Sequence, residues 1–159
     1  MNIGNLEVTL PSETEIEVKR VFDAPRQLVF DAHTKQELVK RWLYGPDEWP
    51  LESVEIDPRV GGEFTYRWKN AGNGTDMVMR GRYKELDPPG RIVHTELFDQ
   101  DWTGGETIVT TLFEERGGKT IMTMRILYSS MEARDGALKS GMNEGMEQAY
   151  ARLDAVMAG

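Results

Sequence analysis

The residues best suited to chemistry are His94 and Glu96, which lie two positions apart in a segment typical of a strand. Successive side chains of a strand alternate between its faces, so both groups are expected to point the same way. A histidine beside a carboxylate in a partly dry pocket can act as a general acid or base. The alternative is an internal network in which the pair satisfies buried polar atoms. No nucleophile or oxyanion donor pair accompanies the two, so we interpret them as a polar anchor for a ligand and predict no catalytic residue.

Composition excludes several other classes of chemistry. The chain has no cysteine, which removes disulfides, thiol nucleophiles and thiolate metal ligands. Its only two histidines, His33 and His94, lie in no metal-ligand spacing, so we expect neither a metal nor another cofactor. A net charge of -8 gives no electrostatic footprint for nucleic acid or an anionic membrane. The sequence shows neither a secretory signal nor a membrane span, so we expect a cytoplasmic protein without membrane insertion.

The elements that would hold His94 and Glu96 are strands with one inner and one outer face. Alternating apolar residues predict such strands over 14–22, 51–56, 62–69, 77–86 and in the segments that follow. The connection DPPG, residues 87–90, has an even number of residues, which places Tyr83 opposite His94. His94 and Glu96 then face inward. By the same reasoning, the turn EERGGK gives three further inward pairs, which are Thr107 with Ile126, Val109 with Met124 and Thr111 with Met122.

The first third of the chain is expected to support one edge of this sheet. Residues 1–13 resemble a flexible arm. Arg20 falls on the inner face of the first predicted strand, and we expect it to pair with an internal carboxylate, with a ligand contact as the alternative. Two short helices are predicted between residues 23 and 43. In the following loop, YGPDEWP, Trp49 is either a lid over a pocket or a plug for the core.

The last stretch, Met131–Met157, has large apolar residues at steps of three or four, which predicts one long helix with an apolar stripe. Everything upstream has the pattern of short strands, so the simplest architecture lays this helix across one curved sheet. Gly141 and Gly145 lie one turn apart beside the stripe. Their missing side chains leave either a close backbone approach or open space. We favour open space, and therefore a cavity that holds a ligand.

The predicted inner face is rich in methionine and in aromatic residues with polar tips. A close-packed core favours leucine, isoleucine and valine in defined rotamers, whereas this mixture suits the lining of a pocket. The alternative is that the same residues simply form a core. We expect the ligand-binding residues to be Trp42, Phe64, Tyr66, Trp68, Met77, Met79, Tyr83, His94, Glu96, Phe98, Val109, Met122, Met124, Met142 and Met146.

Five segments in order resemble the SRPBCC, or helix-grip, superfamily: IEVKRVFDAPRQLVFDA, KRWL, DPRVGGEF, GRYKELDPPGRIVHTE and SGMNEGMEQAYARLDAVM. The branch that they resemble contains bacterial domains similar to the C-terminal domain of the activator of heat-shock-protein-ninety ATPase, near the START and polyketide-cyclase proteins. The resemblance implies an α+β helix-grip fold, in which a curved antiparallel sheet of about six or seven strands wraps around a long C-terminal helix. It also implies two short helices after the first strand and a deep apolar cavity. We expect residues 14–159 to form this single domain.

The resemblance narrows the function without naming a ligand, because the superfamily includes ligand binders, cyclases and co-chaperone modules with no shared catalytic residue. Our first hypothesis is a carrier or sensor of a hydrophobic or aromatic small molecule. The alternatives are a cyclase- or hydrolase-type enzyme that uses His94 and Glu96 without a metal, and a chaperone-linked interaction module. Many relatives have an aromatic residue at the position of Glu96, so this pocket is expected to be more polar than usual. The sequence leaves a homodimer open.

Overall fold

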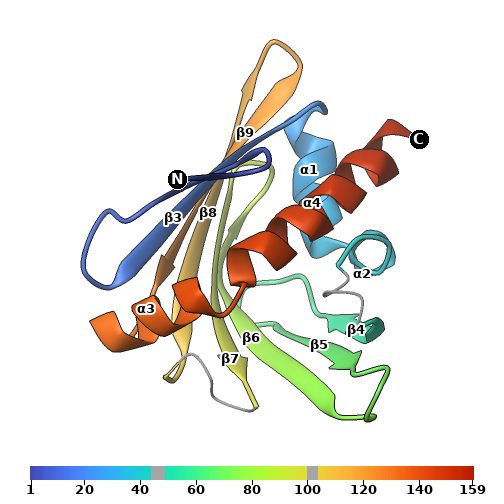
Figure 1. The fold of residues 1–159 in the computed structure, drawn as a ribbon. Coiled ribbons are helices and arrows are strands. Elements are labelled where there is room, and N and C mark those ends of the chain that lie inside the picture. The colour runs from blue at the N-terminus through green and yellow to red at the C-terminus, as the bar shows by residue number, and fades with distance from the viewer. Residues whose placement is uncertain (44–48, 100–103) are drawn as a thin grey trace.

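One curved antiparallel sheet forms the body of the molecule, and the C-terminal helices cross it (Figure 1). The structure is a computed structural model that describes residues 1–43, 49–99 and 104–159. Its elements are, in chain order, β1 (Asn2–Ile3), β2 (Leu6–Thr9), β3 (Glu15–Phe22), α1 (Arg26–Thr34), α2 (Gln36–Val39), β4 (Leu51–Ile56), β5 (Glu63–Lys69), β6 (Asp76–Asp87), β7 (Arg91–Phe98), β8 (Thr107–Arg116), β9 (Lys119–Leu127), α3 (Met131–Lys139) and α4 (Met142–Ala158).

The strand order across the sheet is β1-β2-β3-β9-β8-β7-β6-β5-β4, and each neighbouring pair is antiparallel. The predicted α+β helix-grip class is confirmed, as are the two short helices after the long first strand. The sheet of the described residues has 9 strands, which is more than predicted. Two of the additional strands, β1 and β2, come from the N-terminal segment.

The N-terminal segment, predicted as a flexible arm, contributes the strands β1 and β2 to the sheet. β2 pairs with β3, and the side chains of Leu6 and Val8 are buried. The backbone N–H of Asn5 donates a hydrogen bond to Glu147 Oε2 in α4 at 2.6 Å. The four residues LEVT suffice for a strand because their alternation places two large apolar side chains on the inner face.

β3 carries one charge on its inner face. Val18 and Phe22 are fully buried there, and Arg20 between them is buried as well. The Arg20 guanidinium lies 2.6 Å from the carboxylate of Glu147 and 2.9 Å from that of Asp154, both in α4. The expected pairing of Arg20 with internal carboxylates is confirmed, and it ties β3 to α4.

The predicted single helix over Met131–Met157 is in fact two helices. α3 ends at Lys139, and α4 begins at Met142 after Gly141, whose φ of +82° belongs to the left-handed region. A residue with a β-carbon adopts this conformation at a cost, which makes glycine the suitable residue at the break. Figure 1 shows α4 running across the front of the sheet beside α1, with α3 turned away towards the opposite edge.

The strand register confirms which residues face inward. Tyr83 lies opposite His94 as predicted, next to an irregularity between Tyr83 and Glu85. The β8–β9 pairing differs from the prediction by two positions, since Val109 lies opposite Ile126 and Thr111 opposite Met124. The reason is a turn of only two residues, Gly117 and Gly118, both with positive φ. A shift of two residues keeps every side chain on its predicted face.

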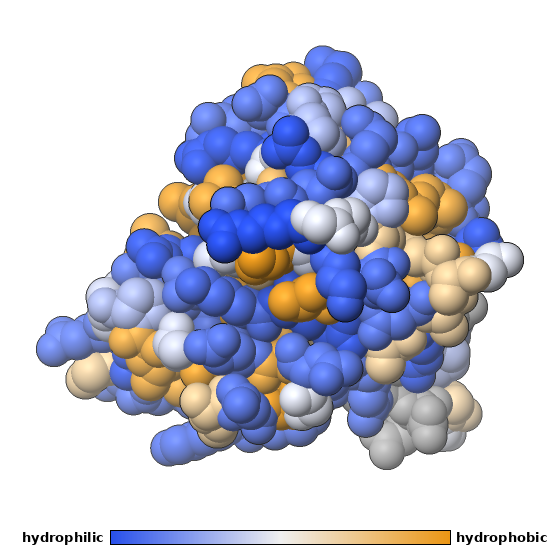
Figure 2. Space-filling view, turned by 90° about the horizontal axis from the view of Figure 1, so that it is seen from above, coloured by the Kyte–Doolittle hydropathy of each residue, from blue (hydrophilic) through white to orange (hydrophobic). Residues whose placement is uncertain are grey.

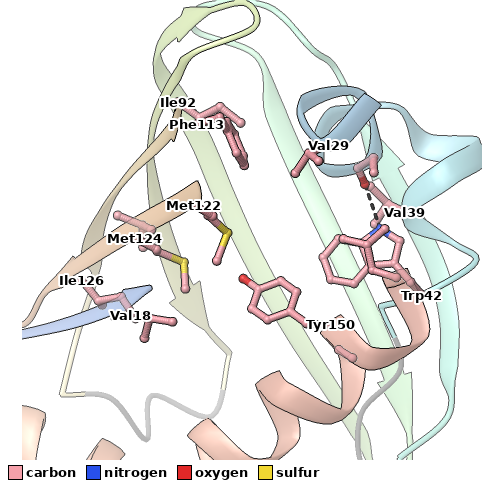
Figure 3. Close-up of a cluster of buried hydrophobic side chains, with 14 of the residues drawn as sticks. Val18, Val29, Val39, Trp42, Ile92, Phe113, Met122, Met124, Ile126 and Tyr150 are labelled. Carbon is pink, nitrogen blue, oxygen red and sulfur yellow. Dashed lines mark hydrogen bonds between the residues drawn. The ribbon is translucent and has the colours of Figure 1, made fainter. Parts of the chain in front are cut away.

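The surface of the described residues is mainly hydrophilic, whereas the interior is mainly apolar. Figure 2 shows that hydrophilic residues cover most of the face seen from above, with hydrophobic residues in separate groups. Inside, the valines, methionines and aromatic residues form one cluster, in which Met122 and Met124 point from β9 towards Tyr150 of α4 (Figure 3). The space between these groups is where the candidate site lies.

Candidate functional site

A cavity of about 550 Å³ lies between the inner face of the sheet and α4. Its walls come from β5 to β9, from the end of α1 and the residues around α2, and from the α3–α4 junction. The predicted site residues that line it are Trp42, Phe64, Tyr66, Trp68, Met77, Met79, Tyr83, His94, Glu96, Phe98, Met122, Met124, Met142 and Met146. Val109 does not line it, and its side chain is fully buried in the hydrophobic core.

The sheet side of the cavity is an aromatic wall. Alternate residues of β5 place Phe64, Tyr66 and Trp68 on one face, with ring centroids 5.0 Å and 6.1 Å apart along the strand. Tyr83 of β6 adds a ring 5.2 Å from that of Phe64. The indole N–H of Trp68 donates to the backbone oxygen of Leu43 at 3.3 Å, which fixes the orientation of the ring. These rings offer a flat apolar surface that suits an aromatic or alicyclic guest.

The α4 side of the cavity has flexible side chains and leaves space unfilled. Met142 and Met146 face the cavity from α4, and flexible thioether side chains adapt to differently shaped guests. A β-carbon at Gly141 or Gly145 would have no other atom within 4 Å. Open space therefore lies beside both glycines, as predicted.

His94 and Glu96 form the expected pair on β7. His94 Nε2 lies 2.9 Å from Glu96 Oε2, and both side chains line the cavity. No described residue pairs with the buried Nδ1 of His94. The ring centroids of His94 and Phe64 lie 5.3 Å apart in an edge-to-face arrangement. Because Nδ1 of His94 is buried and Nε2 contacts Glu96, the polar group of this pair that a guest can reach is the carboxylate of Glu96, whose side chain is 26% exposed.

His33 is a second histidine at the cavity, and the sequence patterns did not identify it as a site residue. It lies in the last turn of α1, where Nδ1 donates to the backbone oxygen of Val29 at 2.7 Å. Burial lowers the pKa of His33 to about 4, so the ring is neutral at ordinary pH. The only available signal was its place three and four residues after Phe30 and Val29 on the apolar side of the helix.

Four tyrosine hydroxyls belong to the same cavity. Burial raises the pKa of Tyr66, Tyr83, Tyr128 and Tyr150, so all four remain neutral hydrogen-bond donors. The Tyr128 hydroxyl lies 3.6 Å from the sulfur of Met142, whereas the other three form no hydrogen bond with a described residue. Tyr128 was not predicted, and Tyr150 was expected only as part of the helix stripe. These hydroxyls add polar points to an otherwise apolar lining.

The described part of the chain limits other interpretations of the site. No three histidine or carboxylate side chains in it lie close enough together to hold a metal ion. None of its helices is long and apolar enough to cross a membrane. Trp49 is half-buried and lines the cavity, whereas residues 44–48 of the predicted lid loop lie outside the described residues.

Comparison with known proteins identifies the fold. The family described as "Activator of Hsp90 ATPase homolog 1-like protein" matches residues 23–158. The chain belongs to this family. The predicted resemblance is therefore confirmed, and the AHSA1-like match includes every strand and helix that lines the cavity. No curated protein sequence matches the chain.

Several solved structures share the fold of this chain. A crystal structure of a protein from Rhodobacter sphaeroides is 33% identical, with a TM-score of 0.89 over 96% of this chain and 98% of that chain. A solution structure from Arthrobacter aurescens is 25% identical, with a TM-score of 0.82 over 96% and 91% of the two chains. An AHSA1-like protein from Aeromonas hydrophila has a TM-score of 0.72 at 15% identity, over 89% and 93%, and shares the fold.

Proposed function

We propose that this AHSA1-like protein binds a small, largely apolar and partly aromatic molecule in the cavity and acts as its carrier or sensor in the cytoplasm. The observation that supports the proposal is the cavity itself, whose volume of about 550 Å³ falls in the range of small-molecule sites. Its lining is mainly aromatic and methionine side chains, with a few polar groups that can orient a guest.

The proposal gives different tasks to different walls. Tyr66, Trp68 and Met79 hold the flat side of the guest against the sheet. Met142 and Met146 close over it from α4. The hydrogen-bonded pair His94 and Glu96 orients a polar substituent. Burial of the apolar guest supplies most of the binding free energy, at about 25 cal/mol for each Å² removed from water.

A thermal-shift panel of apolar and aromatic compounds tests the proposal. A ligand at a hundred times its Kd stabilises the folded protein by about 2.7 kcal/mol, which raises Tm by several degrees. Gly145→Leu should abolish the shift, because the new side chain projects into the cavity where Gly145 now leaves open space. Native mass spectrometry of protein purified from its own cells gives a second route to a bound molecule.

The matched control is Gly136→Leu, on the exposed face of α3 and away from the cavity. Both substitutions replace a helical glycine by the same residue, so they change helix propensity alike. Only the Gly145 variant should lose ligand stabilisation. A panel that stabilises neither wild type nor control, or one that stabilises the Gly145 variant equally, argues against binding in this cavity.

A second candidate is a cyclase- or hydrolase-type enzyme, favoured by the 2.9 Å contact between His94 and Glu96 in a mainly apolar cavity. Such a pair can transfer a proton to or from a bound substrate. With a converted substrate in hand, His94→Ala should abolish turnover while the urea midpoint of unfolding stays unchanged. A variant that is merely destabilised indicates a structural role for the histidine instead.

A third candidate is a chaperone-linked interaction module, favoured by the family description, which names an activator of the Hsp90 ATPase. A pull-down and the ATPase rate of the bacterial Hsp90 homologue, measured with and without this protein, test the candidate. An accelerated ATPase supports it. An unchanged rate at saturating protein argues against it and leaves ligand binding unaffected.

A further inference from the structure

Glu96 is the only acidic side chain among the described residues that line the cavity, and none of those residues is lysine or arginine. It belongs to the inner face of β7, where it lies opposite Thr107 of β8. The side chain is 26% exposed, so the wall does not enclose it completely. The cavity therefore presents one accessible carboxylate in a lining whose only basic side chains are the two histidines, His33 and His94.

The hydrogen bond from His94 leaves part of this carboxylate free. Because a carboxylate only accepts, His94 Nε2 donates to Glu96 Oε2, at 2.9 Å. No described residue donates to the second oxygen, Oε1. A neutral imidazole supplies a hydrogen bond but no positive charge, so it holds the carboxylate in place without neutralising it. A guest can occupy the lone pairs that His94 leaves open.

The charge of Glu96 acts on tyrosines from other walls of the cavity. Burial raises the pKa of Tyr128, which follows β9, and of Tyr150 in α4, and the negative charge of Glu96 raises both further. The pKa of Tyr66 in β5 is raised by burial, by Tyr83 and by Glu96, in that order. The faces of aromatic rings carry a partial negative charge that attracts cations. A cation at Glu96 therefore has aromatic rings in its surroundings as well as a counter-ion.

This lining discriminates between guests of different charge. An anionic guest would place a second negative charge near Glu96, with no lysine or arginine in the described lining to compensate it. A neutral guest would leave the carboxylate without a counter-ion among mainly apolar groups. A protonated amine supplies both a hydrogen-bond donor and the opposite charge, and such charge-assisted hydrogen bonds are the stronger kind. The cavity thus favours a cationic nitrogen at the end of an apolar body.

We propose that the ligand is an amine with an aromatic or alicyclic body, and that its protonated nitrogen binds to the carboxylate of Glu96. The inference rests on the proposed ligand binding and narrows its chemical class. The aromatic wall of β5 holds the hydrocarbon rings, because it lines the same cavity. Thr107, opposite Glu96, marks the part of the cavity where the nitrogen binds.

Three two-ring probes of similar shape test the charge preference by calorimetric titration of the full chain at pH 7.5. They are 4-phenylbenzylamine, 4-phenylbenzyl alcohol and 4-phenylbenzoate, which end in an ammonium, a hydroxyl and a carboxylate group. Wild type should bind the amine about tenfold more tightly than the alcohol, because only the amine forms an ion pair with Glu96. It should bind the carboxylate most weakly. Equal affinities for the amine and the alcohol overturn the inference, while ligand binding stands.

Glu96→Gln removes the charge and keeps the shape of the side chain with one acceptor oxygen. This variant should bind the amine about tenfold more weakly than wild type does, and the alcohol within about twofold of wild type. The matched control is Glu55→Gln, at an exposed glutamate of β4 that does not line the cavity. Both variants lower the net negative charge of the chain by one, so only a local effect distinguishes them. An amine preference that survives Glu96→Gln, or that Glu55→Gln also removes, overturns the assignment to Glu96.

A measurement on wild type keeps the inference testable if Glu96→Gln does not fold. In bound 4-phenylbenzylamine, the methylene group beside the nitrogen should show nuclear Overhauser effects to protons of Glu96 and Thr107, which lie opposite each other. The outer ring of the probe should contact the aromatic wall of β5 instead. Effects that place the methylene group away from Glu96 and Thr107 overturn the inference. Failure of all three probes to bind wild type overturns the proposed binding of aromatic molecules together with the inference.

Discussion

The polar groups of the cavity are uncharged or paired, and this follows from burial. His33 and the tyrosines are held neutral because desolvation disfavours their charged forms. Arg20, the buried cation of β3, is neutralised by two carboxylates of α4. The cavity therefore has neutral polar groups near His33 and a hydrogen-bonded pair at His94 and Glu96. This lining suits a mainly apolar guest that carries a polar substituent.

The lowered pKa of His33 predicts how stability depends on pH. Above pH 6.5 the histidine is neutral in both the folded and the unfolded chain, so stability is fully present. As pH falls from 6.5 towards 4, the unfolded chain binds a proton that the folded chain does not, and the free energy of unfolding falls. At pH 5 this loss amounts to about 2 kcal/mol. Urea unfolding at pH 7.5 and pH 5 should show a loss smaller by about that amount in His33→Phe.

Other titrating groups contribute equally to wild type and variant, so the difference between the two pH-dependent losses isolates His33. An identical loss in both proteins would show that His33 ionises as freely in the folded as in the unfolded chain.

The sequence could place His94 and Glu96 because the side chains of a strand alternate with a period of two, so only the register of the strand is needed. It could not place His33, because the face of α1 that meets the cavity depends on how α4 and β8 pack against it.

At the scale of elements, the break between α3 and α4 shapes the site. An unbroken helix over Met131–Met157 would carry its apolar stripe straight along the sheet. Instead the chain turns at Gly141, and Ser140, Gly141 and Met142 become part of the cavity wall. Apolar steps of three and four continue through the break, which is why periodicity alone predicts one helix. Only the left-handed φ of Gly141 ends the first helix, and a sequence does not display φ.

Two glycine-to-alanine substitutions distinguish the break from the helix interior. Gly141→Ala should lower the free energy of unfolding by about 1 kcal/mol, because alanine is strained at a φ of +82°. Gly136→Ala, in the interior of α3, should raise it by up to about 1 kcal/mol, because alanine favours a helix. Urea unfolding of both variants measures the two signs. A stabilising Gly141→Ala would mean that the helix runs unbroken in solution.

At the scale of the whole molecule, the N-terminal strands complete the sheet beyond β3 and contact α4. β2 covers the free edge of β3, and the N–H of Asn5 joins Glu147, which also binds Arg20. The fold class and the inner faces of the long strands were predictable, because alternation over eight or more residues leaves little ambiguity. β1 and β2 were missed because a pattern of two to four residues cannot be told from a loop until its partner strand is known.

Leu6 and Leu10 provide a matched pair that tests whether this segment belongs to the folded body. Leu6 is 0% exposed in β2, whereas Leu10, just after the strand, is 49% exposed. Leu6→Ala should lower the free energy of unfolding by about 2–5 kcal/mol, because it removes buried methyl groups and leaves a cavity. Leu10→Ala should change it by less than about 0.5 kcal/mol. Neither residue lines the ligand cavity, so both variants should bind a given ligand as wild type does while they remain folded. Equal, small effects of the two substitutions would show that residues 1–13 are a loose arm in solution and that β3 forms the true edge of the sheet.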